Sequence, residues 1–360
     1  MPRVSVVIPV RNEAASIRRT LEGLQRQDCV AADFEVLVVD GMSDDDTVAI
    51  VRDVQQSFPN LRLLFNPKRL ASVARNVGVR HATGDYLVVI DGHCAIGDRQ
   101  YLTNLVRAFE ETGADTLGRP QPLRADRPSA FQRAVSAARM SWLGHNPDSA
   151  IFSDRPRFVD ADNVAVAYRR RVFDTVGYFD EDFDACEDVD FNTRVRRAGL
   201  TCYFTPAISV DYQPRATLKG LAYQMMRYGQ GRSRLGRKYP STITAPSLVP
   251  ALWLVWLAVA GSVAVVWTPA ALALAATISA YILIVVAESA RVARDASVFR
   301  LPIVFAAIHA GFAWGYIKEA VVGFGLMSLP FRLPTNVRRE RAARPWTWAG
   351  RPVSSAAARP

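Results

Sequence analysis

Two short acidic motifs in this 360-residue sequence combine groups that can bind a cation or move a proton. The first is Asp91, Gly92 and His93, which follows directly on an apolar run. A carboxylate and an imidazole two residues apart can face one cleft, and oxygen and nitrogen ligands suit Mn²⁺ or Mg²⁺. A metal in such a place acts as a Lewis acid. The motif therefore predicts a metal site at Asp91 and His93.

The second motif contains Glu187 and Asp188. Glu187 stands three residues after Asp184, which is the spacing of a capping box, so Glu187 is expected to stabilise the start of a helix. Asp190 and Arg194 have the i, i+4 spacing of an ion pair on one helix face. Asp188 has no obvious local partner, so it is the candidate for a general base.

Other polar residues follow predicted strands, and each also has a structural explanation. Asn12 either belongs to a ligand site or caps the helix expected from Ala14. Asp40 ends a strand and can accept hydrogen bonds from a nucleobase or ribose, whereas some of residues 44–46 are expected to cap the next helix. Arg75 can reach a phosphate or face solvent. The segment 224–232 binds substrate or forms an amphipathic surface segment.

These residues are positioned by alternating strand-like and helix-like segments. Strands are expected at 4–10, 34–40, 61–65 and 86–91, and helices at 14–27, 47–58 and 72–81. Near-continuous apolar strands alternating with helices indicate a mostly parallel sheet covered on both faces. Ligands of such sheets bind beyond the carboxyl ends of the strands, where Asp40 and Asp91 stand. The glycine fingerprints of dinucleotide dehydrogenases and P-loop NTPases do not occur at the expected places.

The net charge of +10 is concentrated around the C-terminal apolar region. Residues 215–238 contain seven basic residues and no acidic one, and residues 331–360 contain seven arginines and one glutamate. A nucleic-acid binder usually carries its basic patch on a folded domain. Basic blocks that flank an apolar region instead favour anionic lipid headgroups, so we expect a membrane partner and no nucleic acid.

Residues 239–287 carry no charge, a length that fits two membrane spans. We predict spans at Pro246–Trp267 and Ala270–Ala287, with a break at Thr268-Pro269. A third apolar segment, Leu301–Leu329, contains Lys318 and Glu319. Because a third crossing would place the basic tail outside, we expect this segment to be re-entrant or folded back near Lys318-Glu319. Three full crossings are the alternative.

The order and spacing of the motifs resemble glycosyltransferase family 2, the inverting enzymes with a GT-A fold. SVVIPVRNE resembles the opening strand with its PxxNE, VVDGMSDDDT the VDDGSxDxT loop, and ARNVG with ATGDY the ARNxG…AxGD pair. IDGH stands where the family has its DxD metal motif, EDVDF where it has its ED pair, and QMMRYG is similar to QxxRW. The DGMS loop, the imidazole in the metal motif and His309-Ala310-Gly311 resemble membrane-attached glucosyltransferases of succinoglycan-type exopolysaccharide assembly.

The resemblance implies a role for each matching residue. Asp188, with Glu187 beside it, is the expected catalytic pair, and Asp91 and His93 the metal ligands. The expected nucleotide-sugar site consists of Pro9, Asn12, Glu13, Asp40, Arg75, Asp91 and Gly92. The expected acceptor or diphosphate side consists of Asn163, Gln224, Arg227 and Tyr228. Two positions depart from the family pattern: Gly41 replaces the second Asp of the nucleotide loop, and His93 replaces the last Asp of DxD.

The resemblance also implies an activity and a domain order. The expected reaction moves glucose from UDP-glucose to a lipid-linked saccharide in exopolysaccharide or cell-surface glycan synthesis, with Mn²⁺ or Mg²⁺. We expect a GT-A catalytic domain at 1–214, a basic interfacial segment at 215–245, a membrane region at 246–329 and a disordered basic tail at 330–360. The catalytic domain is expected on the cytoplasmic side of the inner membrane. Alternatives are a processive polysaccharide synthase, a polyprenyl-phosphate glycosyltransferase and a non-enzymatic scaffold that binds nucleotide sugars.

Overall fold

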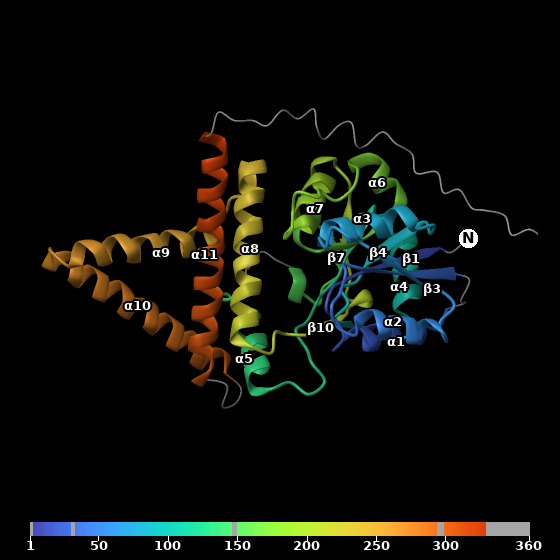
Figure 1. Ribbon diagram of the computed structural model, residues 1–360, viewed down its shortest axis with the longest axis horizontal. Helices are drawn as coiled ribbons and strands as arrows, with labels where there is room; N and C mark the ends of the chain where they lie inside the picture. The colour runs from blue at the N-terminus through green and yellow to red at the C-terminus, as the bar shows by residue number, and fades with distance from the viewer. Residues whose placement is uncertain (1–2, 30–32, 146–149, 294–298, 329–360) are drawn as a thin grey trace, which may run out of the picture. The chain divides into compact units, whose positions relative to one another are not determined.

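A computed structural model describes residues 3–29, 33–145, 150–293 and 299–328 (Figure 1). Residues 1–320 form one compact unit. The strands are β1 (Val4–Val10), β2 (Phe34–Asp40), β3 (Leu61–Phe65), β4 (Tyr86–Val89), β5 (Cys94–Ala95), β6 (Thr116–Gly118), β7 (Arg157–Val159), β8 (Ala165–Arg169), β9 (Cys202–Phe204) and β10 (Asp211–Tyr212). The helices are α1 (Ile17–Gln25), α2 (Thr47–Gln55), α3 (Ala71–His81), α4 (Tyr101–Thr112), α5 (Ala130–Arg139), α6 (Arg170–Val176), α7 (Glu187–Arg197), α8 (Leu218–Lys238), α9 (Ala245–Ala264), α10 (Thr268–Val292) and α11 (Leu301–Ser328).

The strands form a main sheet of order β3-β2-β1-β4-β8-β6-β9-β7. The first four strands are parallel, as their apolar character predicts. Strand β8 runs antiparallel to both β4 and β6, whereas β6 and β9 are parallel. A short antiparallel pair, β5 and β10, lies beside the main sheet and joins the loop after β4 to the segment before α8. The predicted α/β architecture is confirmed.

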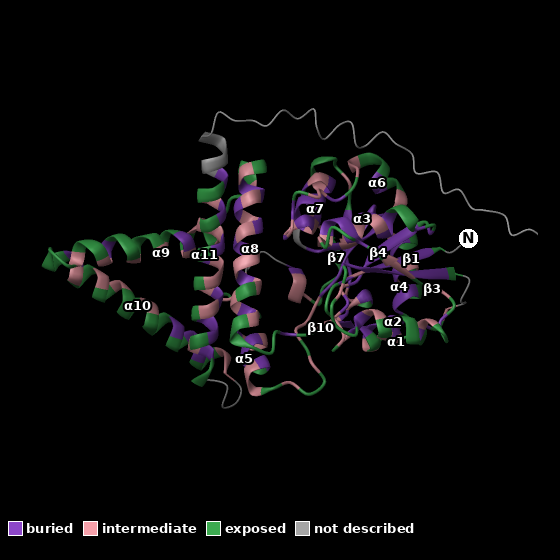
Figure 2. Cartoon of the chain, in the orientation of Figure 1, coloured by how far each residue is buried: buried purple, intermediate pink, exposed green. Residues whose placement is uncertain are grey.

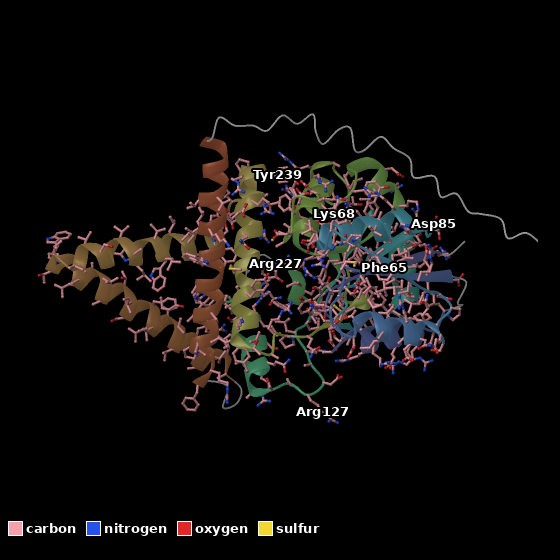
Figure 3. The ribbon with its side chains drawn as sticks, viewed as in Figure 1. Phe65, Lys68, Asp85, Arg127, Arg227 and Tyr239 are labelled. Carbon is pink, nitrogen blue, oxygen red and sulfur yellow. The ribbon has the colours of Figure 1, made fainter. Side chains whose placement is uncertain are left out.

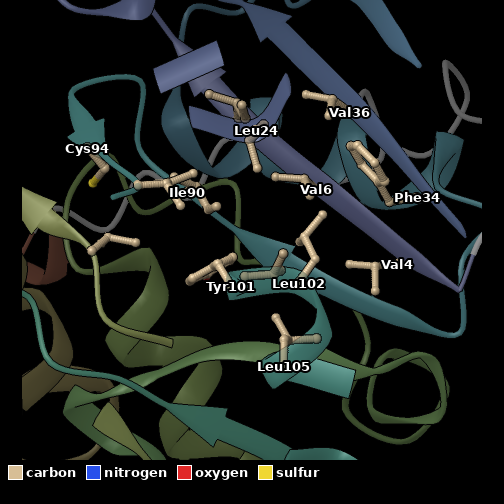
Figure 4. Packing of buried hydrophobic residues seen from close by; sticks show 14 of the residues in the cluster. Val4, Val6, Leu24, Phe34, Val36, Ile90, Cys94, Tyr101, Leu102 and Leu105 are labelled. Carbon is tan, nitrogen blue, oxygen red and sulfur yellow. The ribbon is translucent and has the colours of Figure 1, made fainter. Parts of the chain in front are cut away.

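The central strands are buried on both faces, and successive side chains enter opposite cores. Val6 and Ile8 pack with α1, α2 and α4, and Figure 4 shows part of this cluster. Val7 and Leu37 pack on the other face with α3, α6 and α7. This two-sided burial explains why these strands read as continuous apolar runs, and it fixes the carboxyl ends of β1, β2 and β4 at one edge.

Three apolar helices follow the α/β domain, and each is long enough to cross a membrane. The first two are separated by residues 265–267, directly before the predicted break at Thr268-Pro269. Thr268 and Pro269 themselves begin α10, because proline is tolerated in the first turn of a helix. Figure 2 shows that α9 and α10 expose most of their surface, and 11% of the most apolar window of each is buried, against 33% for α11. The basic tail at 330–360 lies outside the described residues.

Helix α11 runs unbroken through Lys318 and Glu319, so the expected fold-back at this point is wrong. Glu319 is buried and paired with Arg234 and Arg237 of α8, which removes the reason for a turn there. Helices α8 and α11 lie side by side (Figure 1), and a Cβ placed on Gly315 would clash with the Met226 carbonyl oxygen. The two helix backbones therefore touch.

Candidate active site

One cavity of about 160 Å³ lies beyond the carboxyl end of β4. Asp91 lines it from the loop after β4, Asp188 from the first turn of α7, and Gln224 and Tyr228 from α8. Arg75 of α3 also lines it. The structure thus brings together five of the residues that the sequence assigns to metal, base, donor and acceptor roles.

His93 is held by a carboxylate that the sequence assigns to the nucleotide. Its Nδ1 lies 2.9 Å from Oε1 of Glu13, and its ring packs edge-on against Tyr212, with centroids 4.6 Å apart. Burial alone lowers the pKa of His93, but the hydrogen bond to Glu13 and the charge of Asp91 outweigh burial and raise it. Glu13 therefore orients the imidazole, as second carboxylates orient histidine ligands in metal sites.

Gly92 lets this loop pass close to the end of β1. A Cβ at position 92 would lie 2.7 Å from Cγ1 of Val10 and 3.4 Å from Cγ of Glu13. Any larger residue would push Asp91 and His93 away from the strand end. Gly92 is therefore required for close backbone approach, and its role in the nucleotide-sugar site stays a prediction.

Arg75 connects the two acidic motifs. Its guanidinium lies 3.2 Å from Oε1 of Glu187 and 3.8 Å from Oδ1 of Asp91. The expected capping box at Glu187 is wrong: Cys186 is the N-cap residue, and its side chain makes no capping hydrogen bond. Burial raises the pKa of Glu187 although Arg75 favours the charged form. Burial lowers the pKa of Arg75, but the charges of the nearby acidic groups outweigh burial and raise it. Glu187 therefore acts as the partner of Arg75.

Asp188 has a free carboxylate oxygen on the cavity side of α7. Oδ1 accepts a hydrogen bond from the backbone N–H of Val189 at 2.9 Å. Among the described residues, no hydrogen-bond donor contacts Oδ2, which can therefore accept a proton. The predicted pair of Asp190 and Arg194 is confirmed at 3.1 Å, and it leaves Asp188 unpaired.

The strand-end residues toward the β1 and β2 edge bond mainly to one another. Asn12 has φ +57°, and its Oδ1 accepts from the N–H of Asp44 at 3.0 Å, so Asn12 does not cap the first helix. Asp40 is buried, and its two carboxylate oxygens accept from the hydroxyl and N–H of Ser43. Pro9, in β1, pairs with β2. Asn12, Asp40 and Pro9 lie outside the cavity lining.

Helix α8 supplies the acceptor-side residues of the QxxRY motif. Gln224 and Tyr228 line the cavity, and their side chains lie 3.5 Å apart. Arg227, labelled in Figure 3, donates to the backbone oxygen of Asp184 and does not line the cavity. Asn163 ends a short 3₁₀ helix at Ala161–Asn163, and its side chain lies outside the described part of the structure.

Comparison with known proteins decides the family. Residues 5–177 match Glycosyl transferase family 2, and residues 130–318 match Glycosyl transferase family group 2. The chain belongs to glycosyltransferase family 2. Succinoglycan biosynthesis protein ExoA of Rhizobium meliloti is 33% identical over 231 residues, which cover 64% of this chain and 68% of the relative. The predicted resemblance to succinoglycan-type enzymes is confirmed.

Two further proteins place this glycosyltransferase among its relatives. The dolichyl N-acetyl-alpha-D-glucosaminyl phosphate 3-beta-D-2,3-diacetamido-2,3-dideoxy-beta-D-glucuronosyltransferase of Methanococcus voltae is 25% identical over 248 residues, covering 65% of this chain and 74% of the relative. The mannosyltransferase PcManGT of Pyrobaculum calidifontis, solved with GDP-Man and Mn²⁺, has a TM-score of 0.56 at 22% identity, covering 88% of this chain and 87% of that one. The chain therefore has a GT-A-like fold and is a glycosyltransferase of glycan or polysaccharide biosynthesis.

The metal motif of this glycosyltransferase fits a divalent cation that the substrate helps to bind. Nε2 of His93 is buried without a hydrogen-bond partner, which is the state expected of a nitrogen reserved for a ligand. In the described part of the chain, no cluster of three or more His, Cys, Asp or Glu side chains could hold a metal. Asp91 and His93 would thus supply two ligands, and the donor diphosphate would supply others.

The cavity also contains arginines that sequence reasoning missed. Arg119 follows directly on β6, and Arg139 ends α5. The position of Arg119 after a strand was an available signal, because ligands collect at strand ends. Nothing local distinguishes Arg139 from an exposed helix residue, since only the docking of α5 against α8 brings it to the site.

Proposed function

We propose that this glycosyltransferase moves glucose from UDP-glucose to a lipid-linked saccharide during exopolysaccharide or cell-surface glycan assembly, with inversion at the anomeric carbon. The supporting observation is that Asp91 and Asp188 line the same cavity from different elements. Asp91 is placed to help bind the donor diphosphate, and Asp188 is placed to accept the proton of the incoming hydroxyl. ExoA, the relative from Rhizobium meliloti, is a succinoglycan biosynthesis protein, which supports the exopolysaccharide assignment.

Each group has one task in this reaction. Oδ2 of Asp188 accepts the proton of the acceptor hydroxyl as its oxygen forms a bond to the anomeric carbon. The bond from that carbon to the diphosphate oxygen breaks, and UDP leaves with the electron pair. Arg75 stabilises the negative charge of the leaving group. Mn²⁺ or Mg²⁺ at Asp91 and His93 would supply Lewis-acid stabilisation of the diphosphate.

A processive synthase needs a translocation channel, and the two or three apolar helices of this chain are too few to form one. We therefore propose addition of a single sugar. Transfer to a bare polyprenyl phosphate is the other single-step reaction. The length and linkage of the product distinguish these reactions from a processive synthesis.

Release of UDP tests the reaction directly. We expect the purified chain in lipid nanodiscs to release UDP from UDP-glucose, with the rate raised by Mn²⁺ and by a membrane extract that contains lipid-linked saccharides. GDP-mannose serves as the matched donor control and should release less nucleotide. Absence of UDP release under all these conditions would support the non-enzymatic scaffold. A ladder of products would support processivity.

The contacts of α8 and α11 favour two membrane crossings rather than three. Helix α8 is basic, and Lys238 pairs with Asp180 and Asp190 of the α/β domain, so α8 stays at the aqueous side. Helix α11 touches α8 from Gly311, near the Ala222 carbonyl, to Glu319. Because α11 is held along α8 over this length, it lies at the same depth relative to the membrane as α8 and does not cross the bilayer. In Figure 1, α9 and α10 leave this pair at a steep angle, as a hairpin that inserts into the bilayer would.

This arrangement predicts the side of each loop. The α/β domain lies in the cytoplasm, where nucleotide sugars are made, on the inner face of the inner membrane. The turn at Trp267 reaches the periplasm, and the tail after α11 returns to the cytoplasm, consistent with its arginines. Alkaline phosphatase should therefore be active when inserted after Trp267 and inactive when fused after Arg359. Periplasmic activity of the Arg359 fusion would mean that α11 crosses the membrane.

A further inference from the structure

The cavity carries more positive than negative charge. Four arginines and two aspartates line it: Arg75, Arg119, Arg139, Arg215, Asp91 and Asp188. The pairing of Arg75 with Glu187 and Asp91 accounts for one arginine. In the part of the chain that the structure describes, no carboxylate lies within ion-pair distance of the other three. The reaction proposed above assigns no role to these three arginines.

Arg119 is a buried cation without a counterion. Its side chain is among the largest fully buried ones, with a relative exposure of 1%. The guanidinium donates to the hydroxyl of Tyr101 and, at 3.2 Å, to the carbonyl oxygen of Val89, and its Nε has no partner. A buried charge that lacks an opposite charge destabilises a fold. An anion in the cavity would remove this cost.

Arg139 offers a second guanidinium at the end of the cavity formed by α5 and α8. Its Nη1 reaches only the sulfur of Met225 at 3.5 Å, its Cζ lies 5.6 Å from the ring centroid of Tyr228, and its Nε is buried without a partner. Nearby, burial and then the positive charges of Arg139 and Arg232 lower the pKa of His145 to about 4. The imidazole of His145 is thus neutral at pH 7, so the positive charge in this region is carried by the arginines and not by His145.

The position of Arg139 relates this charge to the membrane. Helices α5 and α8 pack against α10 and α11 through one apolar cluster that includes Val135, Met225 and Phe305. Tyr228 lines the same cavity as Asp188, and its ring centroid lies 5.6 Å from the Cζ of Arg139. Asp188 and Arg139 thus line one cavity, and the helices that carry Arg139 and Tyr228 pack on the apolar helices.

We propose that Arg139, with Arg119 as a second buried positive charge, binds an oxyanion of the acceptor, namely the phosphate that joins the acceptor sugar to its lipid. This inference rests on the proposed function, because it assumes that the cavity accepts the sugar of a lipid-linked substrate. Guanidinium groups bind phosphate oxygens through paired N–H donors, and the side chains of both arginines line the cavity. The carboxylate of a uronic acid in the acceptor is the other source of an oxyanion.

Binding of a soluble prenyl diphosphate tests the subsite without the natural acceptor. The full chain in nanodiscs is saturated with UDP and Mn²⁺ to fill the donor site, and farnesyl diphosphate is titrated by calorimetry. We expect Arg139→Gln to weaken binding by roughly tenfold or more, since bonds to a charged group are lost. Arg133→Gln is the matched control, because Arg133 is exposed on the same helix and lies outside the cavity.

Three further measurements make the outcome decisive. Farnesol, which lacks the anion, should show no difference between wild type and Arg139→Gln. Glucuronate binding that depends on Arg139, without dependence for farnesyl diphosphate, would identify a carboxylate and overturn the phosphate assignment. Unchanged farnesyl diphosphate affinity in folded Arg139→Gln, checked by thermal unfolding, would overturn the subsite itself. If that variant does not fold, Arg139→Lys replaces it and should bind several-fold more weakly, because lysine lacks the planar fork.

The same preparations separate this inference from the proposed reaction. Slow hydrolysis of UDP-glucose in the absence of acceptor should be equal in wild type and Arg133→Gln, because position 133 lies outside the cavity. Farnesyl diphosphate binding through Arg139 in a protein that never releases UDP would refute the reaction but keep the subsite. Normal UDP release together with farnesyl diphosphate binding that does not depend on Arg139 would refute the subsite but keep the reaction.

Discussion

Asp188→Asn is expected to lower kcat by about 10²–10⁴-fold while donor binding stays nearly unchanged. The amide can still accept the hydrogen bond from the Val189 N–H, so the start of α7 is preserved. It cannot accept the proton of the acceptor hydroxyl. The loss corresponds to about 3–5 kcal/mol of transition-state stabilisation. Steady-state kinetics with UDP-glucose, together with UDP binding by calorimetry, measure the two quantities separately.

Glu187→Gln is the informative partner of this variant. Glu187 is buried against Arg75, and removal of one member of a buried ion pair costs about 3–5 kcal/mol. We therefore expect a lower Tm and a smaller loss of kcat than for Asp188→Asn. If Glu187→Gln is well folded but inactive while Asp188→Asn transfers sugar at the wild-type rate, the two roles are reversed.

Asp91→Ala is expected to abolish turnover and to leave the fold intact. The side chain is about one-third exposed, and its ion pair with Arg75 is longer than the one that Arg75 keeps with Glu187. Few packing contacts are therefore lost, whereas the expected metal and diphosphate site loses its carboxylate. Circular dichroism and thermal unfolding check the fold, and UDP release across a Mn²⁺ titration checks activity. Near-normal turnover at low Mn²⁺ would refute the metal assignment.

His93→Asp restores the carboxylate found at this position in other family members. We expect it to keep activity with a changed preference between Mn²⁺ and Mg²⁺, because an oxygen ligand replaces nitrogen. The new carboxylate would face Glu13, which lies 2.9 Å from the imidazole in the structure, so like charges would meet without a cation. Metal should therefore raise the Tm of His93→Asp more than that of wild type. Equal metal effects on both proteins would mean that position 93 does not contact the ion.

Much of the fold follows from local sequence. The strands expected at 4–10, 34–40 and 61–65 begin and end at the predicted residues, because a strand buried on both faces must be apolar throughout and polar residues end it. The strand predicted at 86–91 ends earlier, at Val89, and places Asp91 in the loop. The family motifs also located Asp91, Asp188, Gln224 and Tyr228, which the structure gathers in one cavity.

The partners of these residues depended on the tertiary structure. A capping box was the nearest local explanation for Glu187. The packing of α3 against α7 instead places Arg75 beside it, and the buried carboxylate pairs with this guanidinium rather than with a backbone N–H. Glu13 likewise reaches His93 only because β1 and β4 are adjacent in the sheet. Lys318 and Glu319 looked like a break in an apolar segment, yet the arginines of α8 neutralise Glu319 and the helix continues. Sequence patterns determine which segments are buried, whereas the charge that each ionisable group meets is decided by packing between distant segments.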